Sequence, residues 1–336
     1  MWFDTLPRRL RWVLHDSVVM SADPLSTRCV RAGDAEKLHL LKNYDGFIFD
    51  LDGTLWKGST LIPGAKEVLD LLRAQGKHLF FVTNNATKSR TGVLKKMTSL
   101  GLTAYEEEVM GSAHAAAVYL KSKKVQKAYV VGELGLVEEL SAVGVKVLGG
   151  PADSGKSWDW SGDKDPVLSL DPEVGAVVVG LDRAVNYYKL QHACAYITQN
   201  KALFVACNTD ARGNLASTDE WAGAGTMVAA VIGCSEAEPV VCGKPNTLIM
   251  DLLAKSSGIS RNRMCVVGDR LDTDILWGER CGAGTLCVLT GCTSEAQLLS
   301  PTNTIQPNYY VDSLADLLSV KSQLGAGWDA SSCALM

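Results

Sequence analysis

The sequence contains no apolar run that approaches the ~18 residues that a transmembrane helix needs. It also has no C-x-x-C pair among its ten cysteines, and the closest cluster, Cys281, Cys287 and Cys292, lacks the paired spacing of zinc ligands. No secretory signal is visible. We therefore expect no transmembrane segment and free, buried thiols.

Positive charge is not in excess, because 33 lysines and arginines stand against 37 aspartates and glutamates, a net charge of −4. The chain thus lacks the basic footprint of a dedicated nucleic-acid binder, although a few local donors can still bind one phosphate. The five histidines lie outside the motifs described below, which argues against phosphohistidine chemistry or a His-rich dinuclear metal site. The length of 336 residues suits two globular domains.

From residue 44 onwards, short apolar segments alternate with segments of helix length. The pattern predicts strands at 46–49, 78–83, 128–131, 145–148, 174–179, 203–206, 240–242, 264–267 and 285–289, and helices at 63–75, 89–100, 134–142, 187–199, 226–233, 247–256 and 273–280. Strands separated by helices imply right-handed βαβ units. The sequence therefore predicts an α/β fold with a parallel sheet.

Two aspartates follow the first of these strands. Residues two apart in a strand face the same way, so the carboxylates of Asp50 and Asp52 can share one crevice at the carboxyl end of the sheet. Gly53 allows a sharp turn there. One ionised carboxylate can attack phosphorus, and the other can protonate the leaving oxygen and later activate water. Two negative charges facing a phosphate also require a cation, for which Mg²⁺ is the usual choice.

Three further strands end in residues that suit the same chemistry. Thr83 and Asn84 follow the strand at 78–83 and can hydrogen-bond phosphate oxygens. Lys244 follows the strand at 240–242 and offers a point charge to phosphate. Asp269 follows the strand at 264–267 and can complete an Mg²⁺ shell, which Asp274 can orient from one helical turn further on.

These four motifs, in this order, resemble those of the haloacid dehalogenase (HAD) superfamily. The resemblance implies a Rossmann-like core with Asp50 as nucleophile and Asp52 as general acid/base. It implies Mg²⁺ bound by a side-chain oxygen of Asp50, the backbone carbonyl of Asp52 and Asp269, with Asp274 behind them. It also implies that the phosphoryl group is held by Thr83, Asn84 and Lys244.

The spacing between the second and third motifs resembles that of HAD proteins with an inserted α/β cap of the C2 type. We expect a discontinuous core at 43–103 and 236–321, an inserted cap at 104–235, an N-terminal extension at 1–42 and a C-terminal tail at 322–336. The chain looks similar to the 4-nitrophenylphosphatase-like branch, and within it to plant and algal phosphoglycolate phosphatases. The segments 55–58, 82–90, 177–183 and 268–275 carry this likeness.

Two cap segments have two interpretations each. Asn208 and Asp210 resemble an N-x-D element of the loop that covers the active site, and they suit either a structural turn or substrate contact. Asp182 and Arg183 likewise suit a structural or a functional role.

The segment 150–157 fits the nucleotide-binding pattern G-x-x-x-x-G-K-S, with Lys156 as its lysine. The residues that follow cannot form the helix whose N-terminus would receive the phosphates, so we interpret the match as accidental. The last four residues fit a C-a-a-X signal for farnesylation at Cys333, without the second signal that stable anchoring needs. A chance match and a modification site are both open here.

The predicted function is Mg²⁺-dependent hydrolysis of a small phosphomonoester, with 2-phosphoglycolate as the leading substrate, as in photorespiratory metabolite repair. Alternatives are pyridoxal 5′-phosphate, glycerol 3-phosphate or broad 4-nitrophenyl phosphate hydrolysis, and, in another class, a non-catalytic phosphometabolite sensor or scaffold. Relatives suggest a homodimer. We expect a cytoplasmic location, or a chloroplast one if residues 1–42 act as a transit segment. Their basic start favours the latter and their aspartates argue against it.

Overall fold

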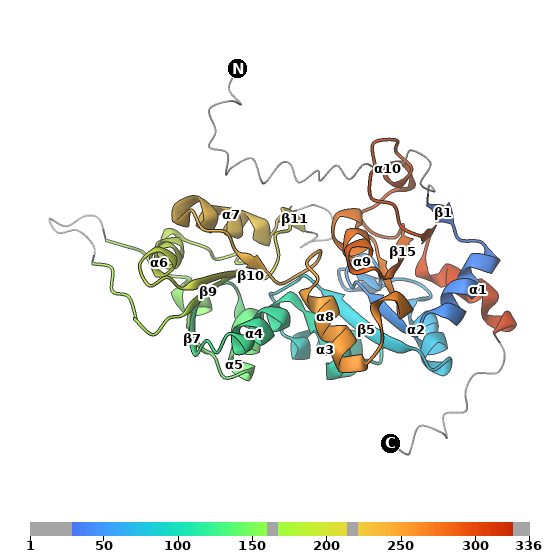
Figure 1. Ribbon diagram of the computed structural model, residues 1–336, viewed down its shortest axis with the longest axis horizontal. Helices are drawn as coiled ribbons and strands as arrows, with labels where there is room; N and C mark the ends of the chain where they lie inside the picture. Colours follow the sequence, from blue (N-terminus) through green and yellow to red (C-terminus); the bar gives the residue numbers. More distant parts are fainter. Residues whose placement is uncertain (1–28, 160–166, 214–220, 325–336) are drawn as a thin grey trace, which may run out of the picture.

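The protein forms two parallel sheets, each covered by helices and each in its own lobe (Figure 1). The structure is a computed structural model that describes residues 29–159, 167–213 and 221–324. One sheet has seven strands in the order β1-β16-β15-β14-β2-β5-β6, and the other has five in the order β13-β10-β9-β7-β8. We call them the core sheet and the cap sheet. The predicted α/β fold with a parallel core sheet and a second, inserted sheet is confirmed.

The core sheet is composed of β1 (Val30–Arg31), β16 (Tyr309–Val311), β15 (Gly284–Val288), β14 (Met264–Gly268), β2 (Gly46–Phe49), β5 (His78–Thr83) and β6 (Val109–Gly111). Its helices are α1 (Asp34–Asn43), α2 (Ala65–Ala74), α3 (Arg90–Ser99), α8 (Leu248–Ser257), α9 (Leu276–Cys281), α10 (Glu295–Leu298) and a 3₁₀ helix at Leu314–Gln323. The central strands β2 and β14 are fully buried, as apolar strands covered on both faces should be.

The cap sheet contains β7 (Lys127–Val131), β8 (Lys146–Gly149), β9 (Ala176–Val179), β10 (Leu203–Ala206) and β13 (Val240–Val241). The segments around it include α4 (Ser112–Ser122), α5 (Leu134–Ala142), α6 (Tyr187–Thr198) and α7 (Ala224–Ser235). One cluster of buried apolar side chains contains Ile48 and Val82 of the core sheet as well as Val130 and Val178 of the cap sheet. The two lobes are therefore packed against each other through a shared interior.

The sequence prediction departs from the structure at several short elements and at α4 (11 residues), which was not predicted. Residues 30–42 were expected to belong to an N-terminal extension. In the structure β1 pairs with β16 of the core sheet, and Leu40 and Leu41 of α1 are buried. How far the extension reaches stays a prediction. A π-helical turn at Leu271–Ile275 precedes α9 where a single helix was expected at 273–280. None of the helices in the described ranges combines the length and the apolar character that crossing a membrane demands.

Two strands lie on the other side of the expected boundaries between core and cap. The expected cap begins at 104, but β6 pairs with β5 in the core sheet. The expected core resumes at 236, but β13 pairs with β10 in the cap sheet. Each of these short strands forms the edge of its sheet just before the chain passes to the other domain. The pairing therefore favours a passage from core to cap after Gly111 and a passage back to the core after Val241. The domain limits themselves stay a prediction.

Candidate active site

The carboxyl ends of β14, β2 and β5 meet at one edge of the core sheet, with β2 between the other two. Asp50 directly follows β2, and the register pairs Phe49 with Val267 on one side and with Phe81 on the other. A cavity opens at this edge, between the core and the cap. Five of the seven predicted site residues line it, namely Asp50, Asp52, Thr83, Asn84 and Lys244.

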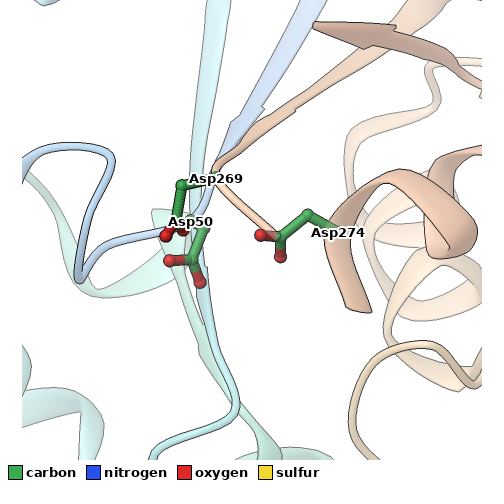
Figure 2. A group of neighbouring side chains, drawn as sticks. All are labelled: Asp50, Asp269 and Asp274. Carbon is green, nitrogen blue, oxygen red and sulfur yellow. The ribbon is translucent and has the colours of Figure 1, made fainter. Parts of the chain in front are cut away.

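The other two predicted residues, Asp269 and Asp274, lie buried beside the cavity. Figure 2 shows the carboxylates of Asp50, Asp269 and Asp274 gathered at one point, the first two from neighbouring strand ends and the third from the helical segment that follows. One oxygen of each lies within 4.8 Å of the others. The structure therefore brings together residues from both halves of the predicted core.

A single ammonium group lies within this cluster. Lys244 Nζ is 2.6 Å from Asp50 Oδ1 and 2.7 Å from Asp274 Oδ1, and it also donates to the carbonyl oxygen of Val82 at 3.2 Å. Burial lowers the pKa of Lys244, but the two carboxylates more than offset this and hold it above its ordinary value. Burial raises the pKa of Asp50, against the opposing effect of Lys244. Lys244 therefore stays cationic and favours an ionised Asp50.

The residues present fit a divalent cation. Burial and the nearby Asp274 carboxylate raise the pKa of Asp269 to about 6, and Asp269 Oδ1 is buried with no hydrogen-bond partner among the described residues. Three carboxylates around one ammonium leave negative charge uncompensated in a buried site, which is costly without a further cation. Carboxylate oxygens are the ligands that Mg²⁺ prefers.

Two glycines keep the space around Asp269 open. A Cβ atom added to Gly53, which has φ +95°, would lie 2.4 Å from Asp269 Oδ2. One added to Gly291 would lie 1.8 Å from the same oxygen. The backbone N–H of Cys292 donates to Asp269 Oδ2 at 2.7 Å. The loop after β15 therefore positions this carboxylate. Sequence analysis missed that loop, although it follows the strand next to β14.

Among the described residues, hydrogen-bond donors reach both oxygens of Asp274, but only one oxygen each of Asp50 and Asp269. Lys244 binds Oδ1 of Asp274, and the backbone N–H of Arg270 donates to its Oδ2 at 3.1 Å. This arrangement suits a residue that orients the site from behind, which is the role that the resemblance implied.

The side chain of Asp52 points to the core side of the cavity. Its Oδ1 accepts hydrogen bonds from Trp56 Nε1 at 2.6 Å and from Lys96 Nζ at 3.2 Å. Trp56 belongs to a small hairpin of β3 (Trp56–Lys57) and β4 (Thr60–Leu61), and Lys96 belongs to α3. Neither contact was predicted, because each joins residues from separate elements.

Thr83 and Asn84 lie at the end of β5 as predicted. The side chain of Asn84 also has a structural task, since its Oδ1 accepts from Lys244 N at 2.8 Å and its Nδ2 donates to Lys244 O at 2.9 Å. The same amide reaches Asp210 Oδ1 of the cap at 3.2 Å. Phosphate binding by Thr83 and Asn84 stays a prediction.

The cap contributes the opposite wall of the cavity through Asn208, Asp210 and Arg212. Burial raises the pKa of Asp210, against the opposing effects of Arg270 and Asn84. Arg212 begins a hairpin of β11 (Arg212–Gly213) and β12 (Trp221–Ala222), and Arg270 lines the cavity from the core. Sequence analysis assigned no role to either arginine, because a lone arginine in a loop carries no spacing signal.

Two other motifs lie outside this cavity. Asp182 forms a buried ion pair with Lys189 at 2.7 Å, and Arg183 binds Glu133, so both act within the cap. Lys156 of the G-x-x-x-x-G-K-S segment pairs with Asp153 at 2.7 Å. In the described part of that segment and the residues up to 159, no α-helix follows. The structure therefore supports the interpretation that the segment 150–157 matches the nucleotide-binding pattern by chance. Cys333 and residues 1–28 lie outside the described residues.

Comparison with known proteins agrees with this geometry. A model of haloacid dehalogenase-like hydrolases matches residues 47–146, and a HAD-hydrolase-like model matches residues 241–317. The chain belongs to the HAD-like hydrolase family and is a HAD phosphatase.

The chain is similar in sequence to several phosphatases of that family. The chain is 45% identical over 318 residues to phosphoglycolate phosphatase 1A, chloroplastic, of Arabidopsis thaliana, covering 93% of this chain and 87% of the relative. It is 40% identical to glycerol-3-phosphate phosphatase of Rattus norvegicus, covering 87% and 95%.

Solved structures share the architecture. The p-nitrophenyl phosphatase from Archaeoglobus fulgidus matches with a TM-score of 0.71 at 30% identity, covering 83% of this chain and 99% of that one. A glycerol phosphate phosphatase from Mycobacterium tuberculosis in complex with magnesium matches with a TM-score of 0.68 at 30% identity, covering 83% and 77%.

Proposed function

We propose that the protein hydrolyses 2-phosphoglycolate to glycolate and phosphate in a Mg²⁺-dependent reaction that passes through an aspartyl phosphate on Asp50. One observation carries the proposal. The Asp50 carboxylate faces a cavity between core and cap and is paired with Lys244 at 2.6 Å. Burial raises the pKa of Asp50, and the neighbouring ammonium group favours the ionised form, in which the carboxylate can attack phosphorus.

Two carboxylates carry out the proposed reaction, Asp50 as nucleophile and Asp52 as general acid and base. An oxygen of Asp50 bonds to phosphorus while the bond to the leaving oxygen breaks, and that oxygen takes a proton from Asp52. Water then attacks the phosphoryl group on Asp50 and gives a proton to Asp52, which restores both groups. Thr83 and Lys244 line the cavity where the phosphoryl oxygens would lie, and Lys244 offsets their charge.

The metal would be held by Asp50 and Asp269, together with the backbone carbonyl of Asp52 that the resemblance implies. When bound, Mg²⁺ supplies positive charge that offsets the repulsion between the nucleophile and the phosphoryl group. Asp274 would keep the role of orienting Lys244 and the turn that follows β14.

Two arginines at the cavity suit a substrate with a second anionic group. Arg212 and Arg270 line the cavity in addition to Lys244, and Arg270 also pairs with Asp272 at 2.8 Å. A guanidinium group can bind a carboxylate through two parallel hydrogen bonds. Glycolate carries such a carboxylate, whereas glycerol presents only neutral hydroxyl groups. Together with the 45% identity to a phosphoglycolate phosphatase, this supports 2-phosphoglycolate over glycerol 3-phosphate.

The test is a panel of kcat/KM values with Mg²⁺ for 2-phosphoglycolate, glycerol 3-phosphate, pyridoxal 5′-phosphate and 4-nitrophenyl phosphate. We expect the highest value for 2-phosphoglycolate. Arg212→Gln should lower that value about tenfold or more, by loss of a charge-assisted hydrogen bond, and change the value for glycerol 3-phosphate by less. A preference for glycerol 3-phosphate would replace the substrate assignment but not the phosphatase chemistry. Absence of phosphate release from all four would favour the sensor or scaffold.

The proposed assembly is a homodimer, as relatives suggested, and light scattering of the purified chain tests it. The location stays a prediction as well. The Arabidopsis relative is named as chloroplastic.

A further inference from the structure

Asp52 is bound by two side chains that the HAD motifs do not include. Trp56 Nε1 and Lys96 Nζ both donate to Asp52 Oδ1, at 2.6 Å and 3.2 Å. Among the described residues, Asp52 Oδ2 takes part in no hydrogen bond. One carboxylate oxygen is therefore fixed by the protein, and the other remains available to a reacting group.

Lys96 is itself held in place by its surroundings. Its ammonium nitrogen lies 4.3 Å from the centre of the Trp56 ring, a cation–π contact, and Trp56 is buried. The Lys96 side chain is only 20% exposed, and in the described part of the chain Asp52 is its one carboxylate partner. A lysine that had only a solubilising role would point its ammonium group into water.

We propose that Lys96, supported by Trp56, is a positioning residue for Asp52: it fixes the orientation of the carboxyl group and compensates the charge that forms there when the leaving oxygen is protonated. The inference rests on the acid/base role of Asp52 in the proposed function.

The charge balance of the first chemical step explains why a cation at this place helps. As the bond between phosphorus and the leaving oxygen breaks, the proton on Asp52 Oδ2 moves to that oxygen. Asp52 then carries a full negative charge, and the ammonium group of Lys96 lies beside Oδ1 to stabilise it. In the second half, Oδ2 accepts a proton from the attacking water, and the pair returns to its starting state.

The test compares two leaving groups. Glycolate leaves as an alkoxide that needs a proton, whereas 4-nitrophenolate is a stable anion that needs none. Lys96→Met should therefore lower kcat/KM for 2-phosphoglycolate about tenfold or more, which is part of the effect of a positioned general acid. The value for 4-nitrophenyl phosphate should fall by less than about threefold. Lys96→Arg, which keeps the charge and a donor, should restore most of the loss.

Lys95→Met is the matched control, because Lys95 is the exposed neighbour of Lys96 on α3. It should leave both substrates unchanged. Trp56→Phe keeps a ring and removes the Nε1 donor, and it should reproduce the selective loss if Lys96→Met fails to fold.

Several results would overturn the inference. Equal losses on both substrates, or no rescue by arginine, would assign Lys96 a structural role only. An unchanged kcat/KM for 2-phosphoglycolate in Lys96→Met would show that Lys96 has no role in the reaction. If Asp52→Asn itself retained near-normal activity on 2-phosphoglycolate, the acid/base assignment of the proposed function would fail instead, so the two failures are distinguishable.

Discussion

The ammonium nitrogen of Lys244 lies 2.6 Å from Asp50 Oδ1. The two residues come from the two separate halves of the core, and the side chain of Asn84, at the end of β5, holds the backbone of Lys244 through hydrogen bonds of 2.8 and 2.9 Å. Lys244 also holds Asp274 at 2.7 Å. A single positive charge therefore connects the proposed nucleophile with the turn that follows β14.

Loss of the positive charge on Lys244 should strongly slow phosphate release. We expect Lys244→Met to lower kcat for 2-phosphoglycolate by about 10²–10³, the usual effect of removing one group that stabilises transition-state charge. Phosphate release measures the rate, and circular dichroism checks that the fold is retained. A folded variant within about threefold of the wild type would contradict the role of Lys244.

The loop after β15 should control the metal through Asp269. Gly291→Ala places a Cβ atom 1.8 Å from Asp269 Oδ2, so the carboxylate must move. We expect weaker Mg²⁺ binding by calorimetry and a higher Mg²⁺ concentration for half-maximal activity. Gly155→Ala is the control, because an added Cβ atom there meets no atom within 4 Å. Unchanged Mg²⁺ affinity in Gly291→Ala would show that Asp269 does not bind the metal.

Most of the predicted site residues were found because they follow an apolar segment that forms a strand, whereas Asp274 lies in the helical turn after β14. Asp50, Thr83 and Asp269 lie where the sequence placed them, since parallel strands bring their carboxyl ends together. The partners of Asp52 were not found. Lys96 lies on α3 and Trp56 in a short hairpin, so only the packing of these elements shows that they meet.

The buried ion pair of the cap should matter for stability. Lys189 and Asp182 are 0% and 2% exposed, and their charged atoms lie 2.7 Å apart. Lys189→Met leaves an unpaired buried carboxylate, which costs about 3–5 kcal/mol in such pairs. Thermal unfolding measures the loss, and Asp182→Asn added to Lys189→Met should recover part of it. Equal melting temperatures for the wild type and Lys189→Met would contradict the account.

The buried carboxylate of Glu139 predicts how the free energy of unfolding depends on pH. Glu139 accepts from Arg90 N at 2.6 Å and contacts His114 Nδ1 at 2.8 Å. Burial raises the pKa of Glu139, but the hydrogen bonds from His114 and Arg90 outweigh it and hold the pKa below its ordinary value of 4.5. The ionised Glu139 therefore stabilises the fold fully above pH 4.5. This stabilisation is lost as the pH falls through the pKa that Glu139 has in the folded protein.

Denaturant unfolding at several pH values tests this. Glu139→Gln should be less stable than the wild type near neutral pH, and the difference should narrow below about pH 4.5. Glu138→Gln changes the exposed neighbour and serves as the control. A difference that is constant with pH would show that ionisation of Glu139 does not contribute.

The helix α1 was missed because its apolar periodicity is weak. In α1 the polar residues Asp34, Glu36 and Lys37 outnumber the buried pair Leu40 and Leu41, so no clear apolar stripe is visible. Arg212 was missed for another reason. Its place over the cavity depends on how the cap packs on the core, and a pattern along the chain does not show this.

The phosphorylated enzyme tests the central claim most directly. Wild-type protein is mixed with 2-phosphoglycolate and Mg²⁺, quenched rapidly in acid and analysed by peptide mass spectrometry. The account predicts a phosphoryl group on the peptide that contains Asp50, located on Asp50 itself, and none in Asp50→Asn, which should retain its fold and release no phosphate. Near-normal turnover by Asp50→Asn, or a phosphoryl group on another residue, would contradict it.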